Sequence, residues 1–214
     1  MPKPTFLRLP AAKQERMMAA AKVEFSRAVF AKASISNIIE LAGVPRGSFY
    51  QYFEDKQDIF FYLLETDGQR FADSFKEIIE AHQGDFFAAV TEFFDVTIDR
   101  LLQSDDAQFY SNVFANMSFK SASHSAFGEA VHRPTDAKHY LEEHIDFAGL
   151  KINTTPQKQL LFRTVMGGFA QSLGYHYNHL DGEQPDTVAD VKKRMAWLLD
   201  WLQNGVLLKE DTHA

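Results

Sequence analysis

Residues 34–56 read SISNIIELAGVPRGSFYQYFEDK and predict two short amphipathic helices joined by a tight turn. The apolar residues of the first helix recur at i, i+3, i+4 and i+7, which places them on one face. They are Ile35, Ile38, Ile39 and Ala42. Gly43 then ends this helix, because glycine tolerates the positive φ found at many helix ends. Val44, Phe49 and Phe53 give the second helix its buried side.

The second helix of this stretch leaves a polar face free. At about 100° per residue, Gly47, Ser48 and Gln51 point away from its buried side. Tyr50 and Tyr52 flank that face. A helix that is held by a partner helix and exposes small and polar groups is suited to the DNA major groove. The pattern therefore predicts a helix-turn-helix that binds DNA.

Length and composition describe an ordinary protein with a full core. The chain has 214 residues, of which 45% are hydrophobic and 24% charged, and this length suits one or two domains. No apolar run approaches the roughly 20 residues that a membrane helix needs, and residues 1–10 lack the apolar segment of a secretory signal. The absence of cysteine excludes disulfides and thiolate chemistry, so we expect a cytoplasmic protein.

The charge is distributed unevenly along the chain. Residues 1–56 carry nine Lys and Arg against five Asp and Glu, a local charge of +4. Residues 57–214 carry thirteen against twenty-four, a local charge of −11, which makes the net charge −7. A basic end on an acidic body suggests that the end contacts phosphate, whereas a chance difference of this size is the alternative.

The rest of the chain predicts helices and no strands, so the fold class is all-α. Residues 1–10 hold three prolines and are expected to form a flexible arm. A first helix follows Pro10, with Met17, Ala21 and Phe25 as its buried stripe, and ends near residues 28–30. Further helices are expected at about 55–82, 86–103, 106–117, 136–147, 155–179 and 186–206.

The last helix has two apolar sides, which a surface helix does not need. Trp197 and Trp201 lie opposite a stripe that begins at Val188, and Gly167-Gly168 interrupts the preceding helix. Each glycine costs about 1 kcal/mol there relative to alanine, so close helix approach or a ligand is the expected reason. These features predict a four-helix dimer interface that contains Gly167, Gly168, Trp197 and Trp201. The alternative is a fully buried helix in a larger monomer.

Many positions agree at fixed spacing with one known family. They are Met17, Ala21, Phe25, Ser34, Ile35, Ile38, Ala42-Gly43-Val44, Gly47-Ser48-Phe49-Tyr50, Tyr52-Phe53 and Lys56. Through them, residues 12–62 resemble the DNA-binding domain of the TetR family of bacterial one-component repressors. The resemblance implies an all-helical homodimer, with a three-helix helix-turn-helix domain at 11–56 and a larger helical ligand-binding and dimerisation domain at 57–214.

The resemblance also implies which residues contact DNA. Those facing base edges or the nearby backbone would be Arg46, Gly47, Ser48 and Gln51. Those binding phosphates would be Ser34, Tyr50, Tyr52 and Lys56. Two departures affect the geometry: Pro45 replaces a side-chain N-cap, and Val29 stands where a helix-ending glycine is frequent, so the turn there is expected to differ.

The function that follows is a non-enzymatic, homodimeric transcriptional repressor, released from a palindromic operator by a small lipophilic or aromatic ligand. The aromatic and Met residues expected to line the ligand pocket are Phe61, Phe75, Phe93, Phe94, Phe109, Phe114, Met117, Phe119, Met166, Phe169 and Tyr175. The alternative for each is that it belongs to the core. A DNA-binding regulator without an inducer remains the second hypothesis.

A metal-dependent enzyme or metal sensor is the third hypothesis. Eight histidines lie beyond residue 56, including His139 and His144 in the segment HYLEEH. These two are five residues apart and do not converge on one ion, while His176 and His179 share a face without a third ligand. We therefore expect no cofactor and no metal, and the partners are double-stranded DNA, a small molecule and a second copy of the chain.

Overall fold

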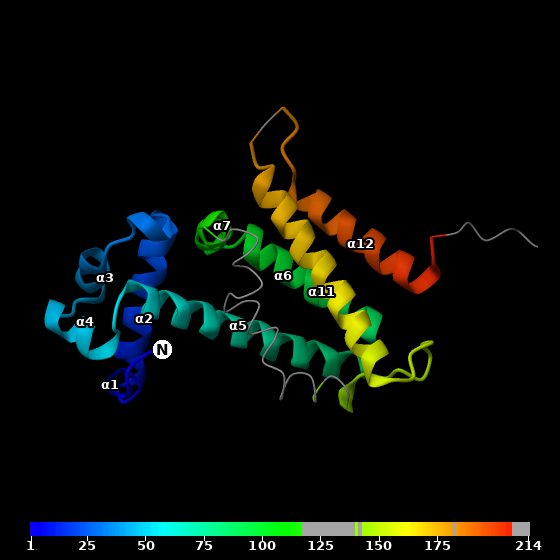
Figure 1. Ribbon diagram of the computed structural model, residues 1–214, viewed down its shortest axis with the longest axis horizontal. Coiled ribbons are helices and arrows are strands. Elements are labelled where there is room, and N and C mark those ends of the chain that lie inside the picture. Colours follow the sequence, from blue (N-terminus) through cyan, green and yellow to red (C-terminus); the bar gives the residue numbers. More distant parts are fainter. Residues whose placement is uncertain (117–139, 141–142, 182, 207–214) are drawn as a thin grey trace, which may run out of the picture. The chain divides into compact units, whose positions relative to one another are not determined.

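The computed structural model describes residues 1–116, 140, 143–181 and 183–206 (Figure 1). Within these ranges the secondary structure is helical, apart from one isolated bridge between Asp85 and Asp146. None of the described helices is long and apolar enough to cross a membrane. The all-α expectation is confirmed. The helix expected at 136–147 falls largely outside the described residues.

The chain divides into two compact units. Unit 1 comprises Met1–Ser74 and the described residues from Arg100 to Asn116. Its helices are α1 (Pro4–Leu7), α2 (Ala11–Arg27), the 3-10 helix η1 (Phe30–Lys32), α3 (Ile35–Ala42), α4 (Arg46–Tyr52), α7 (Ala107–Asn116) and the first part of α5 (Lys56–Ala81). Much of α5 therefore belongs to the same compact unit as the helix-turn-helix, and the domain boundary expected between residues 56 and 57 stays a prediction.

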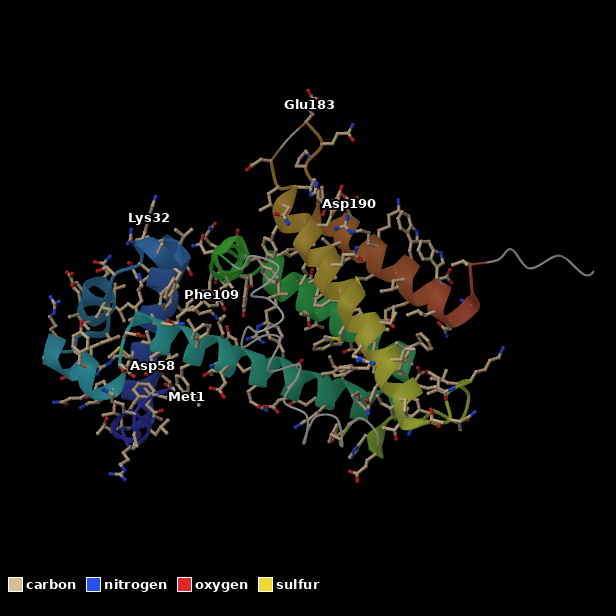
Figure 2. The ribbon with its side chains drawn as sticks, in the orientation of Figure 1. Met1, Lys32, Asp58, Phe109, Glu183 and Asp190 are labelled. Carbon is tan, nitrogen blue, oxygen red and sulfur yellow. The ribbon has the colours of Figure 1, made fainter. Side chains whose placement is uncertain are left out.

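Unit 2 comprises Phe75–Asp99 and the described residues from Tyr140 onward. It contains the end of α5, most of α6 (Phe86–Leu102), α11 (Thr155–Asn178) and α12 (Val188–Asn204). Both α11 and α12 begin with a complete capping box, in which Thr154 pairs with Gln157 and Thr187 pairs with Asp190. Asp190 is labelled in Figure 2 at the start of α12.

The core of unit 1 forms around the predicted stripe of α2. Met17, Ala21 and Phe25 are buried, and α2 packs against both α3 and α7. The ring of Phe25 lies 4.9 Å from that of Phe60 on α5, centroid to centroid, in the edge-on arrangement that aromatic pairs favour. Apolar periodicity therefore identified the correct face of α2.

A polar cluster ties α2, α5 and α7 together within unit 1. The buried carboxylate of Asp67 accepts from Lys22 Nζ at 3.2 Å and from the Tyr110 hydroxyl at 2.9 Å. Lys22 also lies 2.6 Å from Asp106, and Asn112 donates to two carbonyls at the end of α2. Because a buried carboxylate is costly without partners, these contacts stabilise one arrangement of the three helices.

Residues 1–10 differ from the flexible arm that their prolines predicted. Pro4–Leu7 form α1, which packs against α4, and Phe6 is fully buried. Proline suits the first turn of a helix because the N–H that it lacks has no intrahelical partner there. The apolar ring of Phe6, buried among aromatic residues, supplies the energy that orders this segment.

The turn after α2 has the altered geometry that Val29 predicted. Ala28 has φ −140° and Val29 has φ −56°, so neither adopts the left-handed conformation. A β-branched residue would be strained at positive φ, and the chain instead passes through extended backbone into η1.

Unit 2 is built on packed aromatic rings and close helix contact. Phe94 stacks on Phe169 with centroids 4.5 Å apart, and Phe75 lies 4.6 Å from Phe93. Helices α11 and α12 run side by side (Figure 1). The loop between them is held by Asp186, whose carboxylate lies 2.6 Å from Arg194 Nη1. Hydrogen bonds from Arg194 hold the pKa of that carboxyl below its usual range.

Candidate nucleic-acid interface

The helix-turn-helix begins with α3, whose ends follow the local sequence. Ser34 is the N-cap, and its hydroxyl accepts from the Ser36 N–H at 3.2 Å. Gly43 ends the helix in the left-handed conformation, with φ 64°. The Val44 N–H then donates to the Ile39 carbonyl at 3.0 Å, which tightens the turn toward α4. The end of the helix at Gly43 was predicted from residue type.

The sequence of helix α4 contains few features that stabilise a helix by themselves. Pro45 occupies the N-cap without a side-chain hydrogen bond, and the helix is only seven residues long. Isolated helices of this length are not stable in water, so packing must hold it. Phe49 and Phe53 are both fully buried and provide that packing, as the sequence predicted.

The outward face of α4 carries the residues expected to meet DNA. The exposed ones are Arg46, Gly47, Tyr50 and Gln51, and the half-buried ones are Ser48 and Tyr52. Around Gly47, a methyl group placed on the Cα would meet no atom of the protein within 4 Å. Packing within the chain therefore does not require glycine here, and the free space lies on the face that would approach a partner.

Lys56 lies at the start of α5 and is engaged within the protein. Its ammonium donates to the carbonyls of Phe30 at 2.6 Å and Ala33 at 2.9 Å, and it lies 4.7 Å from the centre of the Phe30 ring. These contacts fix the turn before α3. Ser34 similarly uses its hydroxyl as a cap, so the phosphate contacts that the resemblance implies for both residues remain predictions.

Glu24 on α2 was not identified from the sequence, yet it organises the helix-turn-helix. It is 1% exposed, and its carboxylate accepts from Arg27, from the Ser34 N–H at 2.7 Å and from the Asn37 amide. The hydrogen bonds from Arg27, assisted by the other two donors, lower the pKa of Glu24 to about 2. The ionised carboxylate thereby joins α2 to the beginning of α3. The sequence feature that could have identified Glu24 is its position as an acidic residue beside the apolar stripe of α2.

The residues expected to line a ligand pocket belong to both units and differ in their exposure. Phe61 and Tyr175 are exposed, and Phe109, labelled in Figure 2, is buried in unit 1. The rings buried in unit 2 are Phe75, Phe93, Phe94 and Phe169. Phe114 and Met166 are half-buried, and Met117 and Phe119 lie outside the described residues. For the four rings of unit 2, the structure shows the core packing that was the alternative interpretation.

Two hollows on unit 2 each have a volume of about 270 Å³. One is lined by residues around Tyr175, Arg194 and Trp197, and the other lies between α6 and α12 beside Phe94. Tyr175 and Phe94 are the predicted pocket residues that they contain. The proposed ligand pocket therefore remains a prediction.

The residues expected at the dimer interface fall into two groups. Trp197 and Trp201 are 47% and 51% exposed, and Gly167 faces open space. Gly168 instead faces α12 of the same chain, where a methyl group on its Cα would lie 2.3 Å from Leu198 Cδ2. Gly168 therefore allows α11 and α12 of one chain to approach each other closely, and its place at a dimer interface stays a prediction.

The histidines of the described residues take part in ordinary hydrogen bonds. His176 Nδ1 lies 3.0 Å from Asp186, and His179 Nδ1 lies 2.8 Å from the Tyr175 carbonyl. His144 Nδ1 similarly lies 2.9 Å from the Tyr140 carbonyl. Within the described part of the chain, no group of three His, Asp or Glu side chains is placed to hold a metal ion. His139 and Glu142 lie outside it.

Comparison with known proteins supports the same interpretation. A family model described as "Bacterial regulatory proteins, tetR family" matches residues 17–63. A second, described as "Tetracyclin repressor-like, C-terminal domain", matches residues 85–206. The HTH-type transcriptional regulator SAB2452 of Staphylococcus aureus (strain bovine RF122 / ET3-1) is 33% identical over 70 residues. That match spans 33% of this chain and 35% of the relative.

Solved structures share the fold over nearly the whole chain. The regulator FadR from Bacillus subtilis, in complex with stearoyl-CoA, has a TM-score of 0.65 at 16% identity and is matched over 90% of this chain and 99% of its own. FadR from Bacillus halodurans has a TM-score of 0.64 at 16% identity, over 94% and 100%. A TetR-family regulator from Mesorhizobium loti has a TM-score of 0.63 at 15% identity, over 90% and 95%. The chain belongs to the TetR family of DNA-binding transcriptional regulators.

Proposed function

We propose that this regulator is a homodimeric repressor that binds a palindromic operator through α4 and leaves it when a small lipophilic or aromatic ligand binds. The observation that carries the DNA-binding surface is the free face of α4, where Arg46, Tyr50 and Gln51 surround the unobstructed Gly47. Arginine and glutamine side chains suit base edges, and tyrosine hydroxyls suit phosphate oxygens. The absent side chain of Gly47 lets the helix backbone approach the duplex.

The homodimer is proposed from the exposed apolar surface of α11 and α12. Trp197, Trp201, Leu160 and Tyr175 are all at least 47% exposed, and Gly167 offers a flat site on α11. Large exposed aromatic residues of this kind are typical of protein interfaces. In the proposed dimer, two copies of α4 would occupy successive major grooves about 34 Å apart. A ligand would favour a wider spacing that no longer fits the operator.

The class of ligand is proposed from the aromatic content of unit 2 and from a structural neighbour. The Bacillus subtilis FadR structure contains stearoyl-CoA. The rings of Phe75, Phe93, Phe94 and Phe169 offer an apolar interior that could open to a lipophilic molecule. Because these rings pack against one another, such a ligand would have to bind a conformation in which they are separated and would shift the population toward it.

DNA binding can be tested without knowing the operator. A random duplex library is enriched with the wild-type protein, and the resulting sequence is measured by fluorescence anisotropy at several salt concentrations. The proposal expects a palindrome, binding in the nanomolar to micromolar range and a steep loss of affinity with salt. Enrichment of no sequence over a scrambled duplex would contradict it.

A DNA-binding regulator without an inducer is the second candidate, and the packed rings of unit 2 favour it. A thermal-shift screen of fatty acids, acyl-CoA thioesters and aromatic compounds separates the two. Stabilisation by a compound that also releases the enriched duplex supports the inducible repressor. Absence of both effects across the screen supports the second candidate.

A further inference from the structure

The last turn of α4 has backbone carbonyls that its own helix cannot satisfy. An α-helix leaves its last four carbonyls without intrahelical N–H partners. The Phe49 carbonyl accepts from the Phe53 N–H at 2.9 Å, which leaves those of Tyr50, Gln51 and Tyr52. No glycine follows the helix, and no basic residue lies in its last turn. Partners for these carbonyls therefore come either from water or from another part of the chain.

The segment at the N-terminal end supplies a donor to each of these three carbonyls. The Lys3 N–H donates to Tyr52 and the Lys3 ammonium donates to Tyr50, both at 2.8 Å. The Thr5 hydroxyl donates to Gln51. The Lys3 ammonium also places positive charge at the negative end of the helix dipole. All the open carbonyls at this end of α4 are thereby capped from α1 and the residue before it.

Phe6 fixes this segment against the same end of α4. Its ring is fully buried and lies 4.7 Å from Phe53, 5.7 Å from Tyr62 and 6.0 Å from Tyr52, centroid to centroid. Such tilted and edge-on aromatic contacts add to the energy of burying the ring. Phe6 therefore contacts both the end of α4 and the beginning of α5.

The other end of α1 is tied to α2. The side-chain amide of Gln14 donates to the carbonyl of Leu9 at 2.9 Å and to that of Leu7 at 3.3 Å. The segment thus runs from α2, which belongs to the core of unit 1, to the last turn of α4. Its position is fixed at both ends.

We infer that residues 3–6 form a clamp that positions α4 for sequence-specific DNA binding, with Lys3, Thr5 and Phe6 as positioning residues. The inference rests on the proposed function, in which α4 meets the bases. A seven-residue helix without a side-chain N-cap depends on outside contacts to keep its last turn in place. Base contacts require fixed side-chain geometry, whereas phosphate attraction tolerates disorder. Loss of the clamp therefore lowers specific binding more than non-specific binding.

Two variants and two matched controls test the clamp. Phe6→Ala removes the aromatic anchor, and Thr5→Val removes one donor while keeping the shape of the side chain. The control Leu7→Ala truncates the neighbouring residue, which is 55% exposed, and Thr5→Ser restores the hydroxyl. Affinities are measured on the duplex that the wild-type protein enriches and on its scrambled counterpart.

The clamp predicts different losses on the two duplexes. The affinity of Phe6→Ala should fall about tenfold or more for the enriched duplex and less than about threefold for the scrambled one. Thr5→Val should show a smaller loss of the same kind, and both controls should bind like the wild type. An unchanged ratio of the two affinities in both test variants would overturn the inference.

Amide hydrogen exchange gives a readout that needs no DNA. In Phe6→Ala and Thr5→Val, the amides from Tyr50 to Phe53 should exchange faster, while those of α11 and α12 keep their wild-type rates. Unchanged exchange at Tyr50–Phe53 would overturn the clamp. If the wild-type protein enriches no duplex, the proposed function fails and exchange still decides the clamp. If Phe6→Ala unfolds unit 1, the comparison of Thr5→Val with Thr5→Ser decides it.

Discussion

The α3–α4 pair and the α11–α12 pair both contain glycine within a helix, and Gly47 of α4 differs from Gly168 of α11 in what it faces. Gly47 has no protein atom within 4 Å of the position where its Cβ would lie. Gly168 would place that atom 2.3 Å from Leu198 Cδ2. The first glycine leaves space for something outside the chain, whereas the second allows two helices of the same chain to pack closely. A glycine within a helix is therefore compatible with a close approach either by another helix of the chain or by a partner molecule, and the sequence does not distinguish the two.

The two pairs also differ in how their helices are ended. Helices α11 and α12 carry complete capping boxes in their own sequence. Helix α4 has proline at its N-cap and takes its C-terminal caps from Lys3 and Thr5. The helix proposed to meet DNA is thus stabilised by distant residues, while those of the proposed dimer interface are stabilised locally.

DNA binding separates the role proposed for Gly47 from that of Gly168. Gly47→Leu should lower affinity for the enriched duplex about a hundredfold, or about 2.7 kcal/mol, because its side chain would occupy the space that the duplex needs. The fold should be kept, because a Cβ at this position meets no protein atom within 4 Å and glycine within a helix is itself destabilising. Fluorescence anisotropy measures the affinity for the duplex, and circular dichroism measures the helical content. Gly47→Ala is the milder variant. Wild-type affinity in Gly47→Leu would remove α4 from the proposed interface.

The proposed dimer surface should respond strongly to a buried charge. Trp201→Glu should weaken association by about 2–4 kcal/mol, because tryptophan at an interface centre is a common hot spot and a carboxylate there would be desolvated. Sedimentation velocity gives the oligomeric state over a range of concentrations. The control is Val23→Glu, an equally exposed apolar residue of α2. A wild-type protein that is monomeric at micromolar concentration would contradict the dimer itself.

Substitution of Glu24 should destabilise unit 1 more than substitution of an exposed acidic residue. Glu24→Ala should cost about 3 kcal/mol, because it leaves the Ser34 N–H and the Asn37 amide without their acceptor. Urea unfolding measures the free energy, and the exposed Glu15→Ala on the same helix should have little effect. An equal cost at both positions would count against the network.

The pH dependence of Glu24 follows from the sign of its shift. Its pKa falls from 4.5 to about 2 on folding, so the unfolded chain takes up this proton first. The stabilisation is complete above pH 4.5 and is lost as the pH falls toward 2. Glu24→Gln should flatten stability over that range, and unchanged dependence would contradict the assignment.

Alanine at the two neighbouring glycines of α11 gives a matched comparison. Gly168→Ala should destabilise unit 2 by about 1–3 kcal/mol because its methyl group overlaps Leu198. Gly167→Ala should stabilise it by about 0.5–1 kcal/mol, because the position is open and alanine favours a helix. Thermal unfolding measures both, and Leu198→Ala should relieve the first variant. Equal effects at the two sites would show that the contact is not close.

The smallest expected effects concern the N-caps. Thr187→Ala should cost about 1 kcal/mol because α12 loses its capping box. Pro45→Ser should stabilise α4 by less than about 1 kcal/mol, because the new hydroxyl cap is partly offset by a more flexible unfolded chain. Chemical unfolding measures each. A stabilising Thr187→Ala would show that the cap is not used.

Apolar periodicity and capping residues predicted the helices well because both act over one or two turns. The stripe of α2, the Ser34 cap, the Gly43 turn and the outward face of α4 all follow from neighbours in sequence. The aromatic residues expected around a ligand could not be placed in this way. Whether Phe109 or Phe169 lines a cavity or fills a core depends on helices far apart in the sequence.

Residue spacing along the chain is enough to predict an all-helical protein with a helix-turn-helix whose second helix turns a polar face outward, because these features depend on spacing within single helices. Tertiary structure alone decided that residues 3–6 cap α4, that Glu24 joins α2 to α3, and that Gly168 faces Leu198. Each of these contacts joins groups that are ten or more residues apart. Their donors, acceptors and facing surfaces meet only after the core has packed.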